Sequence, residues 1–191
     1  MLPNASDFIN LWQTLSVENG LKGIHFIAHE QDLTDTNKLL DVYERDKILG
    51  FNAINVVNKF PIGKQIPLKY RLAKKILHKN PKFRIIPHIL PYLSEVYSTE
   101  LDRHEDVYPS VLPGWDHTPR TGISGRVILN STPEKFQEVC TRAIENVKNK
   151  SEEKRFIFIK SWNEWAEGNY MEPDMKYGKA YLDALKHALN S

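Results

Sequence analysis

Apolar and polar positions follow two different periods along this chain. Short apolar runs at 24–28, 53–57 and 156–161 predict buried strands, and 83–89 and 108–115 predict two less regular ones. Apolar residues at three- and four-residue spacing predict helices, which we expect at 6–20, 36–49, 67–79, 132–150 and after Asp174. Because strands and helices alternate, we expect an α/β fold with parallel strands and outer helices.

Polar residues at the helix starts refine these boundaries. Ser6, Thr132 and Asp174 each precede a helical pattern and are good N-cap residues.

The single cysteine, Cys140, falls on an apolar helix face, so we interpret it as a core residue rather than a nucleophile.

Chemically active side chains follow the predicted strands. They are Glu30, Trp115, Asp116, Glu164 and Glu167. In a β/α barrel the active site lies at the carboxyl ends of the strands, so this placement favours a shared site. Glu164 and Glu167 are the strongest candidates, because they lie three positions apart in Trp162-Asn163-Glu164-Trp165-Ala166-Glu167-Gly168. Two carboxylates among aromatic rings can divide acid and base roles at a glycosidic bond, whereas the alternative is a pair of solvated loop charges.

Two segments resemble a known family. The first runs from Phe156 to about Leu185 and includes Tyr170, Glu172-Pro173-Asp174 and Tyr177-Gly178-Lys179-Ala180-Tyr181-Leu182. The second is Leu112-Pro113-Gly114-Trp115-Asp116-His117-Thr118-Pro119-Arg120, in which His117 stands where the family usually has Asn. Both are similar to WbsX-type domains, which are glycosyltransferase-like proteins of bacterial lipopolysaccharide and capsule synthesis. They resemble, more distantly, the endo-α-mannosidases of glycoside hydrolase family 99.

The resemblance implies a (β/α)8 barrel of the TIM type and roles for both carboxylates. By similarity to the mannosidases, Glu164 would act as the base on the sugar's own 2-hydroxyl. Glu167 would be the general acid/base at the leaving oxygen. The mannosidases usually carry histidine at the position of Ala166, and alanine there favours the WbsX-like branch and polysaccharide assembly over mannoside hydrolysis.

Further residues of the two motifs are candidates for sugar binding. Tryptophan rings can stack on a pyranose, while the polar side chains can bind hydroxyl or phosphate groups. The candidates are Trp115, Asp116, Arg120, Trp162, Asn163, Trp165, Tyr170 and Glu172. Each also has a structural alternative: Trp162 can be a packing residue, Asn163 can orient Glu164, and Glu172 can hold the loop.

Chain length conflicts with a complete barrel. A closed eight-stranded barrel needs about 250 residues, whereas this chain has 191 residues and four or five predicted strands. The two motifs correspond to the second half of the family domain. We therefore interpret residues 1–191 as a single domain that forms the C-terminal half of a barrel and lacks its N-terminal strands. Such a half would self-associate or pair with a separate N-terminal half.

Composition and charge limit where the protein can reside and which ligands it can hold. There is no apolar run near the ~18 residues that a transmembrane helix needs and no signal-like N-terminus, so a cytoplasmic protein is expected, with the inner face of the membrane as an alternative place. The seven histidines form no HxxxH or Cys/His cluster, so we expect no metal and no cofactor. Net charge is +2, yet 47–94 contains ten Lys or Arg residues and no Asp or Glu.

The basic segment has two interpretations. It is a solvated helix face, or it is a surface for anionic lipid head groups or a phosphate-bearing sugar donor. Nucleic acid is disfavoured, because the segment lacks the glycine and aromatic pattern of a known binding module.

Three functions follow from the sequence. The first is a glycosyltransferase-like protein of surface-polysaccharide synthesis that uses Glu164 and Glu167. The second is an endo-acting glycosidase like the family 99 mannosidases. The third is a non-catalytic half-barrel that binds sugar or pairs with a separate half.

Overall fold

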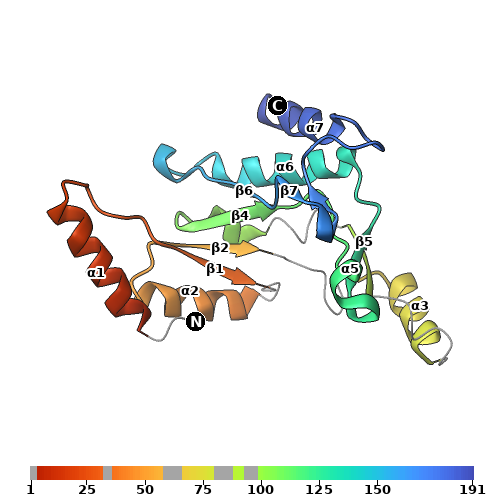
Figure 1. Cartoon of the computed structure of the whole chain (residues 1–191), viewed down its shortest axis with the longest axis horizontal. Coiled ribbons are helices and arrows are strands. Elements are labelled where there is room, and N and C mark those ends of the chain that lie inside the picture. Colours follow the sequence, from red (N-terminus) through yellow and green to blue (C-terminus); the bar gives the residue numbers. More distant parts are fainter. Residues whose placement is uncertain (1–3, 32–35, 58–65, 80–87, 93–98) are drawn as a thin grey trace.

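A four-stranded parallel sheet forms the centre of the protein. The computed structural model describes residues 4–31, 36–57, 66–79, 88–92 and 99–191 (Figure 1). The strands of the sheet, in spatial order, are β1 (Ile27–Gln31), β2 (Ala53–Val57), β4 (Val107–Val111) and β6 (Phe158–Ile159). Every neighbouring pair is parallel, so the predicted parallel α/β fold is confirmed. Among the described residues β1 pairs only with β2 and β6 only with β4, which leaves both at the edges of this sheet.

Helices accompany the strands along the chain. The longer ones are α1 (Ala5–Glu18), α2 (Thr36–Ile48), α3 (Leu68–Lys79), α6 (Pro133–Val147) and α7 (Ala180–Leu189). In Figure 1, α2 lies beside β1 and β2, and α6 lies beside β4 and β6 with α7 beyond it. No helix within the described ranges is long and apolar enough to cross a bilayer.

Shorter elements complete the chain. They are β3 (His88–Pro91), β5 (Arg126–Leu129), β7 (Asn163–Glu164), β8 (Asn169–Tyr170), the short helix α5 (Thr118–Thr121) and the 3₁₀ turns Glu100–Arg103, Gly122–Ser124, Glu152–Lys154 and Trp165–Glu167. β3 and β5 form a separate parallel pair, and β7 and β8 form an antiparallel hairpin.

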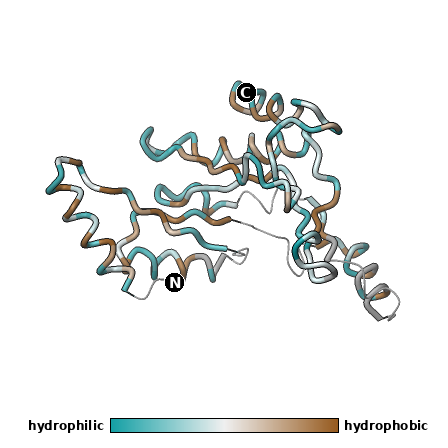
Figure 2. The backbone as a smooth tube through the Cα atoms, in the orientation of Figure 1, coloured by the Kyte–Doolittle hydropathy of each residue, from teal (hydrophilic) through white to brown (hydrophobic). Residues whose placement is uncertain are grey.

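Two apolar clusters hold the helices against the sheet. Under α2, Tyr43 packs on alternate residues of the strands, including Ile54, Val56 and Val107. Figure 2 shows the corresponding hydrophobic positions along β2 and β4. The second and larger cluster lies between β4, α6 and α7, and it contains Phe136.

Cys140 lies in the larger cluster, as the apolar face of its helix predicts. Burial raises the pKa of its thiol to about 12. A thiol with so high a pKa is a poor nucleophile near neutral pH, which supports a packing role.

Several predicted boundaries need correction. Ser6 does not cap α1: the helix begins one residue earlier, and the Ser6 hydroxyl donates to the Leu49 carbonyl at 3.1 Å. β1 begins at Ile27, three residues later than the apolar run predicts. Thr132 does cap α6, because its side chain accepts from the Lys135 N–H. Asp174 does not cap α7, which begins at Ala180.

Some strands are shorter than the sequence predicts, and others were not predicted. The predicted strand at 108–115 ends at Val111, and only Phe158–Ile159 of the run 156–161 pairs in the sheet. β5 and the β7–β8 hairpin were not predicted. Most of the run 83–89 lies outside the described residues, and β3 is its described continuation.

Candidate functional site

Two loops meet at the carboxyl end of the central sheet. One leaves β4 and carries Pro113–Arg120 of the segment Leu112–Arg120, which is the first motif in chain order; the other leaves β6 and carries Trp162–Gly168, which is the second motif in chain order. They are joined directly, because the Asp116 N–H donates to the Glu167 carbonyl at 2.7 Å. Residues separated by about fifty positions in sequence are therefore neighbours, as parallel strands with a common carboxyl edge predict.

Glycines allow this close approach. A Cβ atom at Gly114 would lie 3.0 Å from the Gly168 carbonyl oxygen and 3.2 Å from Ser131 Oγ. Gly168 has a φ of +56°, a conformation that residues with a side chain rarely adopt, and its own Cβ would lie 3.4 Å from that of Asp116. Both motifs therefore need their glycines in order to pack loop against loop.

The unpredicted strand β5 supports the first loop from its other side. The Ile128 N–H donates to the Trp115 carbonyl at 2.8 Å, and the His117 N–H donates to the Arg126 carbonyl at 3.0 Å. Asp116 and Val127 form an antiparallel bridge between these segments. The loop that follows β4 is thus held on both sides by backbone hydrogen bonds.

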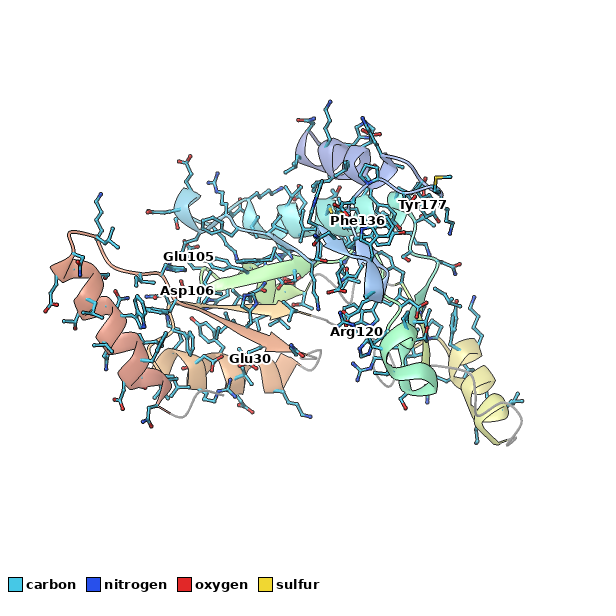
Figure 3. The ribbon with its side chains drawn as sticks, viewed as in Figure 1. Glu30, Glu105, Asp106, Arg120, Phe136 and Tyr177 are labelled. Atoms are coloured by element: carbon cyan, nitrogen blue, oxygen red, sulfur yellow. The ribbon has the colours of Figure 1, made fainter. Side chains whose placement is uncertain are left out.

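Arg120 joins the two carboxylates of the second motif. One guanidinium nitrogen lies 3.0 Å from Glu164 Oε1 and the other lies 3.3 Å from Glu167 Oε1. Arg120 is the last residue of the first motif and lies in α5, which begins within that motif, and Figure 3 shows its position there. One cation therefore fixes the position of both candidate catalytic side chains relative to the first motif.

The two carboxylates differ in their surroundings. Glu167 is buried, with 7% of its surface exposed, and its Oε1 also lies 3.5 Å from His117 Nε2. Glu164 has a side chain that is one-third exposed, and its N–H donates to the Ser161 hydroxyl. The pair therefore presents one enclosed and one solvent-facing carboxylate.

Lys160 adds a second cation beside the pair. Its ammonium lies 4.5 Å from the centre of the Trp115 ring, and Trp115 is itself 7% exposed. Burial lowers the pKa of Lys160, while the charges of Glu167 and Glu164 act in the opposite direction. Trp115 therefore lies beneath a lysine rather than presenting an open face, which favours a packing and charge-supporting role for this ring.

Aromatic rings gather on the other face of the β7–β8 hairpin. The Trp165 and Tyr170 rings are stacked at 3.7 Å with 16° between their planes, and the Trp165 indole N–H donates to Glu172 Oε2 at 2.5 Å. The Tyr170 hydroxyl donates to Asp174 at 2.9 Å. Burial, together with this hydrogen bond, raises the pKa of Tyr170 to about 12. Trp165 remains half exposed, so one of its faces is accessible.

The hairpin register separates these two groups. Asn163 pairs with Tyr170 and Glu164 pairs with Asn169, so Asn163 and Tyr170 share the face opposite Glu164. A cavity of about 330 Å³ lies beside Tyr170. Its lining includes Gly114, Gly168, Asp174, Tyr177 and Tyr181.

The structure brings most of the predicted site residues together but gives them different surroundings. Glu164, Glu167 and Arg120 form one contact group, and Trp165, Tyr170 and Glu172 form another. Trp162 is 56% exposed, which argues against a packing role, and Asn163 is also exposed. Asp116 uses its carboxylate locally, because Oδ1 accepts from both the N–H and the hydroxyl of Thr118.

Glu30 lies outside this site. Its carboxylate pairs with Arg45 of α2 at 2.5 Å, on the helix-covered face of β1. Figure 3 shows Glu30 and Arg120 well apart. Position after a strand was therefore an insufficient criterion, because the direction of the side chain across the strand decides which face it reaches.

Sequence reasoning missed three residues that contact the carboxylate pair or support it. They are His117, Lys160 and Ser161. Lys160 and Ser161 directly precede the second motif, and His117 lies inside the first. Their positions beside the motifs were the signal that could have identified them as site residues. Within the described ranges, no group of three or more His, Cys, Asp or Glu side chains is arranged to hold a metal ion.

The fold and the site together define a parallel α/β protein with paired carboxylates at the carboxyl ends of its strands. Comparison with known families gives a more specific assignment. The model of the family described as Glycosyltransferase WbsX matches residues 1–185, which is nearly the whole chain. The chain therefore belongs to the WbsX glycosyltransferase family, as its two motifs predict.

Two curated relatives come from Xanthomonas campestris pv. campestris. Each carries the description "Uncharacterized protein WxcX"; one is from strain B100 and the other from strain ATCC 33913. Each is 30% identical over 99% of this chain, whereas the match covers 25% of the relative. The chain thus spans about a quarter of the length of these relatives. No solved structure matches the chain.

Proposed function

We propose that this chain forms the catalytic end of a carbohydrate-active, glycosyltransferase-like protein of bacterial surface-polysaccharide assembly. The observation that carries the proposal is the bridge from Arg120 to both Glu164 and Glu167. It joins the two motifs of the WbsX family into one acidic site at the end of the sheet. Membership of the family supports a sugar as the substrate.

The proposed chemistry divides acid and base roles between the carboxylates. Glu164, the more exposed one, takes the proton of a sugar hydroxyl as that oxygen bonds to the anomeric carbon. Glu167, enclosed beside Arg120 and His117, donates a proton to the departing oxygen as the bond between that oxygen and the anomeric carbon breaks. The half-exposed guanidinium of Arg120, beside Glu167, can bind the phosphate of a phosphate-bearing leaving group.

The aromatic side of the hairpin would bind the rest of the glycan. Trp165 on this side, and Trp162 directly before β7, are both about half exposed, so their rings can stack on the C–H faces of pyranose units. The cavity beside Tyr170 offers room for a further sugar unit, with Asp174 and Tyr177 at its wall. Asn163 lies on this face, where its amide can bind a hydroxyl.

A second candidate is an endo-acting glycosidase of the family 99 type. Two carboxylates held by one cation also suit hydrolysis, in which water replaces the acceptor hydroxyl. Ala166, where the mannosidases carry histidine, favours the transferase.

Binding and turnover separate these candidates. Purified protein is titrated with saccharides and nucleotide sugars while tryptophan fluorescence is recorded, since Trp162 and Trp165 face solvent. Turnover is then followed in the longer protein that contains this chain together with the segment that completes its sheet, as acceptor-dependent release of nucleotide from nucleotide sugars and as release of free sugar from α-mannosides. Acceptor-dependent nucleotide release supports the transferase, whereas free sugar from mannosides supports the glycosidase. A folded protein that binds no sugar contradicts both.

We also propose that the chain is one part of a larger (β/α)8 barrel. The supporting observations are the unshared edges of β1 and β6 among the described residues and an apolar stripe on α1. Phe8, Leu11, Trp12 and Leu15 are between 38% and 56% exposed on one side of that helix. A preceding barrel segment, or a second copy of the chain, would cover both the stripe and the β1 edge.

This proposal predicts self-association of the isolated 191 residues with little turnover. Sedimentation velocity should show dimers or larger species, and Leu11→Glu with Leu15→Glu should shift the distribution toward monomer. Val17→Glu is the matched control, because Val17 is 62% exposed but lies away from the stripe. A stable and fully active monomer would show instead that the shorter architecture is complete.

A further inference from the structure

Helix α3 presents a second exposed apolar stripe at the opposite end of the molecule from α1. Leu68, Leu72 and Ile76 are 64%, 49% and 69% exposed. They follow one another at four-residue spacing, so they lie on one side of the helix, within about 80° of arc at 3.6 residues per turn. Figure 1 shows α3 projecting at the edge of the described part of the protein.

Basic residues flank the stripe on both sides. Lys69, Arg71 and Lys75 are exposed, and α3 contains no acidic residue. At helical geometry Lys69 falls about 20° beyond Ile76, and Lys75 falls about 20° before Leu68. The segment 47–94, which contains α3, has ten basic and no acidic residues. Figure 2 shows hydrophilic and hydrophobic positions side by side along α3.

The charge distinguishes this stripe from the one on α1. The 14 residues of α1 include no Lys or Arg, which suits burial against protein. In α3 the apolar stripe lies between cations whose long side chains can reach outward while their stems lie on an apolar layer. A helix with this arrangement lies in the interface of a bilayer, with its apolar side among acyl chains and its cations on lipid phosphates.

We propose that α3 docks the protein on the surface of an anionic phospholipid bilayer. Leu68, Leu72 and Ile76 insert among the acyl chains, and Lys69, Arg71 and Lys75 contact the phosphates. The contact is peripheral and is independent of the sugar chemistry assigned to Glu164 and Glu167.

Vesicle sedimentation tests this proposal. The protein carries Leu11→Glu and Leu15→Glu, so that the α1 stripe contributes nothing, and vesicle-free samples correct for aggregation. Sucrose-loaded vesicles of phosphatidylcholine are compared with vesicles of phosphatidylcholine mixed with phosphatidylglycerol. We expect binding to the anionic vesicles that weakens at high salt and little binding to the neutral ones.

Variants locate the contact. At about fivefold in partitioning per basic residue, Lys69→Gln with Arg71→Gln and Lys75→Gln should weaken binding roughly a hundredfold. Leu72→Ser with Ile76→Ser should also abolish most binding. Lys148→Gln with Lys179→Gln and Lys186→Gln, three exposed lysines elsewhere, should change it little.

Three results would overturn the proposal. The first is anionic-vesicle binding that survives the α3 variants. The second is equal binding to neutral vesicles. The third is competition by inorganic phosphate at matched ionic strength, which would identify a site for a small anion instead of a membrane surface.

Discussion

Glu167→Gln should lower the turnover of the active enzyme by about 10²–10⁴-fold, and Glu164→Gln should have an effect of similar size. Glutamine keeps the shape of each side chain but cannot exchange the proton that the proposed mechanism requires. It also replaces a charged partner of Arg120 by a neutral one, at 3.0 Å for Glu164 and 3.3 Å for Glu167. Turnover is measured as sugar transfer, with kcat and KM determined separately.

A matched control separates catalysis from folding. Glu153→Gln changes an exposed glutamate outside the site and should leave turnover unchanged. Circular dichroism and thermal melting should show that the two site variants stay folded. If both retained the turnover of the unmodified protein, the assigned roles would be wrong.

Phe136→Ala should cost about 3–5 kcal/mol of unfolding free energy, the largest stability loss that we expect from a single substitution. Phe136 is 0% exposed and packs its ring at 5.6 Å from that of Tyr181, so it joins α6 to α7. Removing the ring leaves a cavity that the surrounding helices cannot fill. Denaturant unfolding measures the loss of free energy. Thermal unfolding should show a melting temperature lower by about 10 °C.

Phe156→Ala is the control for ring loss. Phe156 is 51% exposed, although its ring lies 5.6 Å from that of Tyr108. Its loss should cost only about 1 kcal/mol, because much of its surface is already in water. Equal losses at the two positions would contradict the assignment of the core between α6 and α7.

The sequence predicted the sheet better than it predicted the loops. The apolar runs located β2 and β4 best, because these strands are buried on both faces, and Ala53–Val57 was placed without error. The partly exposed edge strands β1 and β6 were placed less well. Thr132 was identified as a cap because its hydrogen bond is local. Asp174 was misassigned because its side chain binds Tyr170 and the backbone of Tyr177, partners that spacing alone does not reveal.

The candidate site could be predicted as a set of residues but not as an arrangement. The two motifs named Glu164, Glu167 and Arg120 as candidates, and common placement after strands predicted that the two motifs lie on one rim of the sheet. That Arg120 bridges both carboxylates depends on the close contact of Gly114 with Gly168 and on the unpredicted strand β5. Asp116 could not be recognised as a local turn residue, because its Thr118 bonds depend on the backbone after β4.

The most direct test is a crystal structure of Glu167→Gln with a bound saccharide that the unmodified protein turns over. The proposed site predicts a sugar oxygen within about 2.6–3.2 Å of the Glu164 carboxylate or of the amide at position 167. It also predicts a pyranose ring on Trp162 or Trp165. A saccharide bound elsewhere, with no contact to either position, would contradict the assignment of this carboxylate pair as the catalytic centre.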